Sequence, residues 1–585
     1  MKERSVVLGW YDSLARFKKL DSRRRPLRYE RIPVPEPTRV FRKGLIRKTG
    51  KDALRENILV AKNMVEFVET LLGPRRRSKI VLSQSGRSLL TFVTTDLKTI
   101  LKRVRLEHPV AQLMAGATFS VFQEKGDGSV STIILTGKIL EECEKLIDEG
   151  FHPNVICEGL ILCYKKVMQT SDKLNFDPQL NPTEVITLVV HNALTGKLPY
   201  QDREHIATLV SEATKVLGLK TLSSYGGTDI IDVKKITGKS VKDSFLVDGL
   251  ALYREMPNIY MPRRIENARI ALIKGELRIP SKKLTRYQDY QFEFNTVEQF
   301  HNFRDAKLKY LKSITDRILR VGANVIMLEK GVDDFVLDYL AKQNILLVRR
   351  FPPTEVDRVA KATGAFAVAS IHDVDPSYLG WANIVEHKKI KGEPWLIIKG
   401  CKNPKTIDIV LRGLSRYLLD DVERIIKGAV LVAKTLIKDH RLVCGGGAFE
   451  EEIALALNKY APGIADKRQL VIKAVAKAFE SIPLLLGRSA GMDEIDVITK
   501  LRAKHSTGEA SIGIDVINSQ LADMSKLRVF DSLAVKKQVI KAAFETALTI
   551  VRIDDNIKCR ELPEPEKYYA KRMAKTKDVK IEEET

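Results

Sequence analysis

The sequence predicts a multidomain α+β protein in which helical regions at both ends of the chain flank an α/β segment. At 585 residues the chain is too long to fold around one hydrophobic core. Apolar residues recur at helical spacing near both ends, whereas short apolar strands alternate with a helix in the middle. Hydrophobic residues make up 44% and charged residues 29%, a balance that excludes a disordered chain.

The first helical region begins near Asp52, where apolar residues recur at helical spacing until Gly73-Pro74 ends the run. A strand is expected at 89–93, and a second apolar helix after Asp127-Gly128-Ser129. The chain turns helical again from Asp420, with long runs expected at 422–437, 449–459, 469–479 and 535–549.

The middle of the chain reads as short strands with a helix between the first two. Apolar strands are expected at 268–274, 323–328 and 345–348, and a polar helix at 297–319. Because strands alternate with helical sequence there, we expect an α/β module inserted into a helical domain.

Both ends of the chain are strongly charged. Residues 1–48 hold fifteen Lys or Arg against five Asp or Glu, within a chain of net charge +24. Pro26, Pro33, Pro35 and Pro37 prevent a continuous helix, so this segment is expected to be an extended basic arm. Such an arm can attract nucleic acid, acidic tails or the acidic face of a partner. Residues 561–585 are expected to form a charged tail.

Composition also argues against several classes of protein. The apolar runs, such as Ile482 to Leu486, are far shorter than the roughly 20 residues that span a bilayer, so no membrane partner is expected. The N-terminus lacks the apolar core of a secretory signal, and we expect a cytoplasmic protein. Six cysteines without a C-x-x-C pair and nine histidines without metal-ligand spacing give no indication of a zinc site.

Two short motifs suggest phosphate binding. The glycine-rich turn at Asp127-Gly128-Ser129 precedes a helix, whose positive N-terminal end exposes backbone N–H groups to an anion. Gly238-Lys239-Ser240 looks like the end of a P-loop, but Val233 occupies the position of the first glycine and no strand leads into it. We therefore reject the P-loop interpretation.

A longer series of motifs follows a recognisable order. The series is Leu72-Gly73-Pro74, Thr94-Thr95-Asp96, Glu107-His108-Pro109, Gly126-Asp127-Gly128, Met261-Pro262-Arg263, Leu411-Arg412-Gly413, Gly445-Gly446-Gly447, Gly513-Ile514-Asp515 and Ile550 to Asp555. Each motif alone is typical of a turn. In this order, over about residues 50–560, they resemble the group II chaperonins, the archaeal thermosome and its eukaryotic cytosolic relatives.

The resemblance implies a chaperonin fold with three kinds of domain. These are a mostly helical equatorial domain, an α+β intermediate domain and an α/β apical domain with a helical lid protrusion. The expected boundaries are 1–48 for the basic arm, 49–164 and 415–560 for the equatorial domain, 165–232 and 385–414 for the intermediate domain, 233–384 for the apical domain and 561–585 for the tail.

The resemblance also implies a function. Group II chaperonins form double rings, of one or several kinds of subunit, that bind unfolded protein clients and use ATP and Mg²⁺ to assist folding. By motif position, the residues implied to bind nucleotide are Leu72, Gly73, Pro74, Asp127, Gly128, Ser129, Ser131, Gly446, Gly447, Asp515 and Asp531. Asp127 is implied to hold Mg²⁺, and Asp96 to be catalytic beside the γ-phosphate.

The chain departs from the family pattern at positions that matter for hydrolysis. Active relatives carry a second catalytic Asp where this chain has Gly428. A fully active chaperonin would need that carboxylate from a neighbour such as Asp420 or Asp421. Helix geometry argues against this, because Asp421 lies seven positions from Gly428, about 10 Å along a helix. Leu97 and Val130 also replace a glycine and a threonine of the pattern. We therefore expect reduced ATP hydrolysis, and whether the chain is an ATPase stays open.

Two alternatives remain at this point. Arg75-Arg76-Arg77 either strengthens phosphate binding or forms a solvated surface run. The whole chain could instead be a non-folding scaffold or an RNA-associated protein on a chaperonin fold, with the arm at 1–48 contacting nucleic acid.

Overall fold

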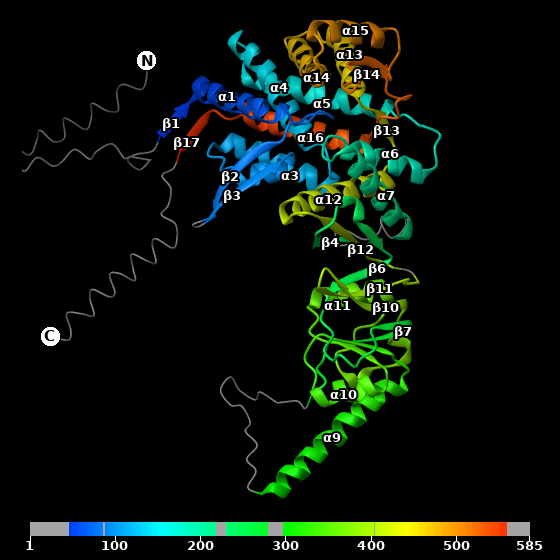
Figure 1. Ribbon diagram of the computed structural model, residues 1–585. Helices are drawn as coiled ribbons and strands as arrows, with labels where there is room; N and C mark the ends of the chain where they lie inside the picture. Colours follow the sequence, from blue (N-terminus) through cyan, green and yellow to red (C-terminus); the bar gives the residue numbers. More distant parts are fainter. Residues whose placement is uncertain (1–45, 86–87, 218–229, 279–295, 403, 559–585) are drawn as a thin grey trace, which may run out of the picture. The chain divides into compact units, whose positions relative to one another are not determined.

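The computed structural model describes residues 46–85, 88–217, 230–278, 296–402 and 404–558 (Figure 1). Strand β1 (Ile46–Thr49) pairs with β17 (Asp555–Lys558) in a two-stranded sheet. Residues Thr49–Asp554 form one compact unit, which holds all the features considered below. Residues 1–45 of the basic arm and the tail from 559 onward lie outside the described residues.

A helical region is built from both ends of the compact unit. Its main helices are α1 (Gly50–Glu69), α3 (Pro109–Lys125), α4 (Ser129–Asp148), α5 (Pro153–Lys173), α13 (Ala448–Tyr460), α14 (Arg468–Ala490), α15 (Glu494–Ser506) and α16 (Leu533–Val551). Helix α4 is its centre and packs against α1, α14, α16 and α3. Segments that are hundreds of positions apart in sequence therefore share one core.

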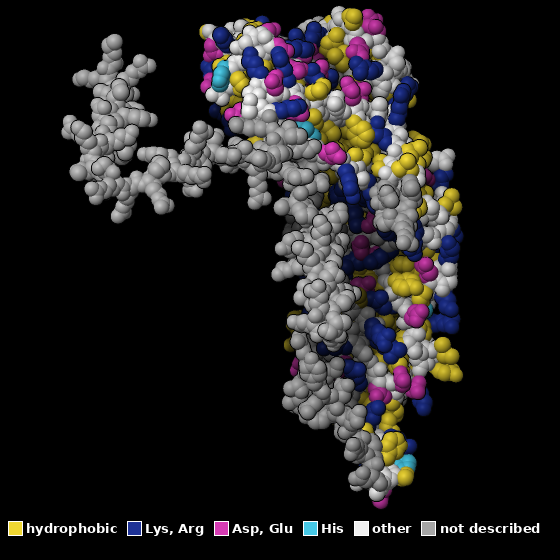
Figure 2. Space-filling view, turned by 90° about the vertical axis from the view of Figure 1, so that its left-hand side faces the viewer, with side chains coloured by type: hydrophobic (Ala, Val, Ile, Leu, Met, Phe, Trp, Pro, Cys, Tyr) yellow, Lys and Arg dark blue, Asp and Glu magenta, His cyan; other side chains and the backbone are white. Residues whose placement is uncertain are grey.

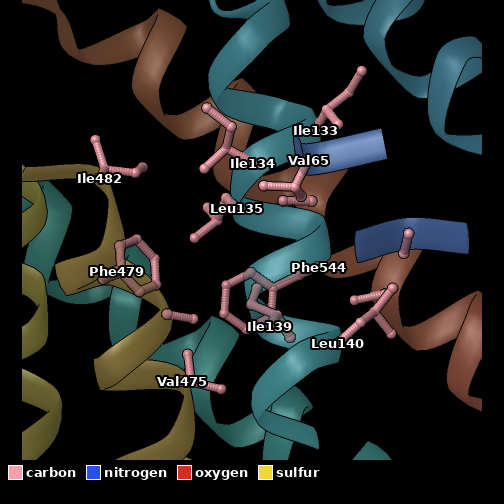
Figure 3. Packing of buried hydrophobic residues seen from close by; sticks show 14 of the residues in the cluster. Val65, Ile133, Ile134, Leu135, Ile139, Leu140, Val475, Phe479, Ile482 and Phe544 are labelled. Carbon is pink, nitrogen blue, oxygen red and sulfur yellow. The ribbon is translucent and has the colours of Figure 1, made fainter. Parts of the chain in front are cut away.

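The packing around α4 explains its sequence. Figure 3 shows Ile133, Ile134, Leu135, Ile139 and Leu140 of α4 beside side chains from α1, α14 and α16. A helix that is apolar on most of its circumference is one that is enclosed by other helices. Gly137 of α4 lets the helices approach closely, because a Cβ there would lie 2.2 Å from Val65 Cγ2 of α1.

Short elements connect these helices. Strands β2 (Lys79–Ser85) and β3 (Ser88–Thr94) form an antiparallel hairpin, followed by α2 (Leu97–Arg103). Two further strand pairs are β13 (Leu442–Cys444) with β16 (Phe530–Ser532), and β14 (Ile512–Asp515) with β15 (Gln520–Asp523).

A second region combines helices with a three-stranded sheet. The helices are α6 (Pro182–Leu194), α7 (Tyr200–Leu217) and α12 (Arg416–Lys438), and the sheet has the order β4 (Ile231–Thr237), β12 (Ile407–Gly413), β5 (Phe245–Val247). β12 runs parallel to β4 and antiparallel to β5. Ion pairs also join this sheet to α11 (Pro353–Thr363). Arg358 of α11 pairs with Asp232 and with the buried Asp408.

The central segment contains a six-stranded mixed sheet. Its order is β6 (Gly249–Tyr253), β11 (Glu393–Lys399), β10 (Gly380–Ile390), β7 (Arg264–Ile273), β8 (Val325–Leu328), β9 (Leu346–Val348). The β7–β8–β9 part is parallel, and the other pairs are antiparallel. The helices of the same segment are α9 (Val297–Arg320), α10 (Asp334–Lys342) and α11.

The predicted α+β fold class is confirmed, and each expected helix and strand is present. Several elements were not predicted, among them β2, α5, β10 and β11. Helix α14 was expected to end at residue 479, but it continues to Ala490 through Pro483. Pro483 is buried, so tertiary packing outweighs the local cost of an internal proline. The lid protrusion is expected between Leu272 and Gly322, and residues 279–295 of that segment lie outside the described residues.

The sheets suggest where the domains meet. The expected borders at 232/233 and 384/385 fall inside β4 and β10, each of which is a continuous strand of one sheet. The chain passes from the three-stranded to the six-stranded sheet between β5 and β6, and it returns between β11 and β12. The amide of Gly400 donates a hydrogen bond of 2.9 Å to the carbonyl of Asp248, which links these two connecting segments. We therefore propose that the apical segment runs from about residue 248 to 400.

Candidate functional site

A cavity of about 550 Å³ lies where the helical region meets α6, α7 and α12 of the second region, and its volume is within the range of small-molecule sites. The sequence analysis singled out twelve residues for nucleotide, and all twelve line this cavity: Leu72, Gly73, Pro74, Asp96, Asp127, Gly128, Ser129, Ser131, Gly446, Gly447, Asp515 and Asp531. Gly428, Arg76 and Val130 line it as well. Residues from both ends of the chain thus converge on one space.

The loop from Gly126 to Ser131 forms one wall. Gly126 and Gly128 have φ angles of 81° and 87°, a left-handed conformation that side chains rarely adopt. Gly128 precedes the first turn of α4, and no side chain caps that turn. The first amides of α4 are therefore available to an anion at the positive end of the helix dipole.

A phosphate group fits the chemistry of this wall. The hydroxyl of Ser129 is buried and has no hydrogen-bond partner among the described residues. A buried hydroxyl without a partner is costly, and a phosphate oxygen would accept its hydrogen bond. Gly73 on the opposite loop also leaves no room for a side chain, since a Cβ there would lie 2.6 Å from Leu486 Cδ2.

Asp127 is held by positive charge. Lys197 Nζ lies 3.0 Å from Asp127 Oδ1, and Arg76 is near enough for its charge to act on the carboxylate. Burial by itself raises the pKa of Asp127, but Lys197, Arg76 and the amide of Gly128 together hold that pKa below its usual value. Asp127 is therefore ionised near neutral pH, as a Mg²⁺ ligand must be.

Asp96 has a structural role in the same wall. Its side chain caps α2, where Oδ2 accepts hydrogen bonds from the amide and the hydroxyl of Thr99 at 3.0 and 2.6 Å. Arg424 Nε of α12 lies 3.3 Å from the same oxygen. Asp96 is thereby fixed at the edge of the cavity beside a guanidinium.

Gly428 of α12 lies directly against the loop from Gly126 to Ser131, which is the phosphate-loop candidate. A Cβ at Gly428 would lie 2.8 Å from the carbonyl oxygen of Gly126, and a Cβ at Gly126 would lie 2.2 Å from the carbonyl oxygen of Gly428. The loop and α12 therefore meet backbone to backbone. A side chain at 428 would therefore have to displace the carbonyl of Gly126 slightly.

The end of the cavity around Gly446 is lined by both apolar and charged side chains. Gly446 packs so closely on Met524 that a Cβ would lie 2.6 Å from Met524 Sδ. Lys536 Nζ lies 2.7 Å from Glu450 and 3.0 Å from Asp531, and the two acids raise its pKa despite its burial. Asp515 accepts hydrogen bonds from the amides of residues 517 and 518, which fixes the turn at the cavity edge.

Sequence reasoning missed several charged residues of this site, namely Lys197, Glu450, Lys536 and Arg424. Lys197 follows Gly196, where a Cβ would lie 2.8 Å from the carbonyl oxygens of Gly73 and Pro74. The sequence feature that could have indicated Lys197 is the glycine immediately before it, in the connection between α6 and α7. Nothing in the local sequence around Glu450 or Lys536 distinguishes them from surface charges.

The described residues hold no group of three or more His, Cys, Asp or Glu side chains arranged to bind a metal ion. A Mg²⁺ ion commonly takes one or two carboxylates together with the phosphates of a nucleotide. Asp127 beside the loop fits that arrangement. The residues present are thus compatible with Mg²⁺ bound jointly by Asp127 and a phosphate chain.

No described helix is both long enough and apolar enough to cross a membrane. The surface in view in Figure 2 carries Lys and Arg interspersed with Asp and Glu. The proposed contact of the basic arm with nucleic acid falls largely on residues outside the described ranges.

Comparison with known proteins agrees with this geometry. The model of the TCP-1/cpn60 chaperonin family matches residues 64–561. The chain is 36% identical to a thermosome subunit of Pyrococcus horikoshii, over 90% of this chain and 95% of that protein. It is 36% identical to thermosome subunit alpha of Aeropyrum pernix and 35% identical to thermosome subunit alpha of Archaeoglobus fulgidus, with 89% and 90% of this chain and 94% and 95% of those proteins covered. The chain therefore belongs to the TCP-1/cpn60 chaperonin family.

Proposed function

We propose that this chain is a subunit of a group II chaperonin ring that binds ATP in the cavity described above and hydrolyses it slowly while assisting the folding of client proteins. One observation carries the proposal. All twelve candidate residues and Gly428 line one cavity, which supports a phosphate site that lacks one carboxylate. The thermosome subunits that it resembles support the ring and the folding role.

Different residues of the cavity would bind different parts of the nucleotide. The amides at the start of α4 and the hydroxyls of Ser129 and Ser131 would donate to phosphate oxygens. Lys197 and Arg76 would add positive charge beside Asp127. At the other end, Gly446, Gly447 and Met524 line the part of the cavity where the ribose and base would lie.

Hydrolysis needs more than binding. A bound Mg²⁺, held by Asp127 and the phosphates, would neutralise charge on the phosphate chain. A carboxylate that orients the attacking water is the part that the chain lacks at Gly428. Asp96 is held by Thr99 and Arg424, and position 428 supplies no second carboxylate. These observations support binding with slow turnover.

The experiment compares ATP binding and ATP turnover in three proteins: the unmodified chain, Gly428→Asp and Gly428→Ala. A Cβ at 428 would crowd the carbonyl of Gly126, so Gly428→Ala reports the steric cost alone. We expect the unmodified chain to bind ATP and to hydrolyse it slowly. Gly428→Asp should hydrolyse at least tenfold faster than Gly428→Ala, because a positioned proton acceptor contributes about 10²–10⁴-fold to such reactions.

Two results would contradict the proposal. Turnover by the unmodified chain at the level of Gly428→Asp or above would show that the missing carboxylate does not limit hydrolysis. Failure of the unmodified chain to bind ATP at millimolar concentration would show that the cavity is not a nucleotide site.

A further inference from the structure

A second cavity, of about 640 Å³, lies beside the β10–β11 hairpin and the ends of β4 and β12. Its charged lining is six basic side chains, Lys239, Lys388, Lys389, Lys391, Lys399 and Arg412, against two acids, Asp243 and Glu386. It shares no lining residue with the first cavity. Lys239 belongs to the Gly238-Lys239-Ser240 motif that the sequence analysis rejected as a P-loop.

Two tight turns bring these charges together. Gly238 and Lys239 have φ angles of 94° and 66°, and Lys391 and Gly392, at the tip of the hairpin, have 55° and 82°. Lys391 Nζ donates a hydrogen bond of 3.2 Å to Thr237 Oγ1, and a Cβ at Gly238 would lie 3.3 Å from the same nitrogen. The two turns therefore touch, and each places a lysine at the mouth of the cavity.

Most of this positive charge has no acidic partner within the described residues. Lys399 pairs with Glu386 at 3.1 Å, and Arg412 Nε donates to the carbonyl of Gly238 at 3.1 Å. Asp243 already accepts the amide of Ser240. In the described part of the chain, no ion pair is formed by Lys239, Lys388, Lys389 or Lys391. Like charges around a hollow repel one another, and an anion that enters it relieves that repulsion.

The floor of the cavity is apolar. Phe245, Ile390 and Ile397 line it and pack on the small core formed by Ile236, Val247, Ala251, Trp395 and Val410. Lysine stems can lie along such a surface while their ammonium groups face the ligand. The site therefore offers an apolar base with a cationic rim, which suits a compact carbon body that bears several phosphate groups.

We propose that this cavity binds a small polyanion with several phosphate groups. Its volume lies within the range of small-molecule sites. The cations come from the ends of two sheets around a hollow, whereas nucleic acid is typically met by a stripe of basic residues along one face. A ligand that contacts Lys239 on one side and Lys388 on the other links the two sheets. The proposal is independent of nucleotide binding in the first cavity.

The test is isothermal titration calorimetry of the full chain with two probes, inositol hexakisphosphate and linear tripolyphosphate. The pocket variant is Lys388→Ala with Lys389→Ala, since neither side chain makes a bond that the fold needs. The matched control is Lys342→Ala with Lys361→Ala, two exposed lysines outside the cavity that give the same change in net charge. We expect saturable 1:1 binding of at least one probe, at least tenfold weaker binding in the pocket variant and unchanged binding in the control.

Two further variants separate this cavity from the rest of the molecule. Lys388→Arg with Lys389→Arg keeps the charge and should retain binding. Arg76→Ala in the first cavity should leave the binding of inositol hexakisphosphate unchanged. The two probes distinguish a cyclic ligand, which the apolar floor favours, from a linear phosphate chain. Circular dichroism spectra of all variants verify that they are folded.

Several outcomes would overturn the proposal. Equal weakening in the pocket and control variants would indicate general charge attraction, and unchanged binding in the pocket variant would place the probe elsewhere, such as on the basic arm. Loss of binding in Arg76→Ala would assign the probe to the first cavity. Binding of a single-stranded RNA oligonucleotide, with no binding of either probe, would point to a different class of partner.

Discussion

Arg76 is a basic residue of the first cavity whose charge would favour a bound phosphate. It follows the Leu72-Gly73-Pro74 turn, lines the first cavity, and its Nε donates to the carbonyl of Gly73 at 3.2 Å. Burial lowers the pKa of this guanidinium, and the charges of Asp127 and Asp96 oppose that shift. Arginine stays protonated under such conditions, so a fixed positive charge faces the space that phosphates would fill.

Arg76→Ala is expected to weaken ATP binding about tenfold, because a hydrogen bond to a charged group contributes about 1.5–3 kcal/mol. Arg77→Ala is the matched control, since Arg77 is exposed and does not line the cavity. Fluorescence titration with a labelled ATP analogue measures both variants. If both lose affinity equally, the arginine run acts as a diffuse surface charge.

Some of this site could be predicted from residues alone. The phosphate-loop candidate at Gly126 to Ser131 follows from the glycine pattern before an apolar helix, and Gly428 stands out against the motif that surrounds it. The contact between Gly428 and Gly126 could not be predicted, because it joins positions 302 apart through tertiary packing. The same applies to Lys197, whose partner Asp127 lies 70 positions away.

Among the elements, α13 and α14 share a buried acidic cluster that makes the stability of the helical region depend on pH. Glu451 of α13 is 1% exposed, and burial together with the charge of Glu480 on α14 raises its pKa to about 7. Arg502 compensates Glu480 through bonds of 2.9 and 2.6 Å. One oxygen of Glu451 has no hydrogen-bond partner among the described residues.

The sign of the pH effect follows from the raised pKa. Between pH 4.5, the ordinary value, and about 7, the folded state binds the proton of Glu451 more tightly than the unfolded state does. The free energy of unfolding therefore falls as pH rises through this range, by on the order of 3 kcal/mol from this group. Glu451→Gln should remove this contribution, so the urea midpoint of the variant falls less between pH 5 and pH 8. The exposed Glu149→Gln is the control, and a variant that follows the unmodified chain at every pH would refute the assignment.

Secondary structure was the most predictable level, because helical and strand periodicities are local. The strands at 268–274, 323–328 and 345–348 appear close to their expected ranges as β7, β8 and β9. Strand β2 was missed, since its charged start at Lys79 and polar end at Ser85 hide the alternation, and it exists through pairing with β3. Domain borders were also hard to place, because the expected border at 232/233 falls inside β4, whose partner β12 is distant in sequence.

At the scale of the whole molecule, the β2–β3 hairpin presents an apolar face outward. Ile80, Leu82 and Val93 are 69%, 66% and 60% exposed, and Ile80 pairs directly with Val93 across the strands. The opposite face is covered, since Val81 is buried and the ring of Phe92 packs edge-on against Tyr417 at 5.6 Å. A two-stranded sheet with apolar residues on both faces needs a second contact surface, which another subunit of the proposed ring would supply.

Ile80→Lys with Leu82→Lys is therefore expected to lower the assembly state, because two charges would enter an apolar contact between subunits. Ile259→Lys with Val297→Lys places the same charges at other exposed apolar positions and serves as the control. Sedimentation velocity measures the mass of each assembly. An unchanged assembly in the hairpin variant, or dissociation of both variants alike, would refute a role of this face in subunit contact.

Residues from both ends of the chain would build the proposed nucleotide site. Electron cryomicroscopy of the protein with a slowly hydrolysed ATP analogue and Mg²⁺ is the decisive test. We expect nucleotide density in the first cavity, with the phosphates against Gly126 to Ser131 and the base beside Gly446 and Met524. An empty cavity at saturating analogue, or nucleotide density at another place in the chain, would contradict it.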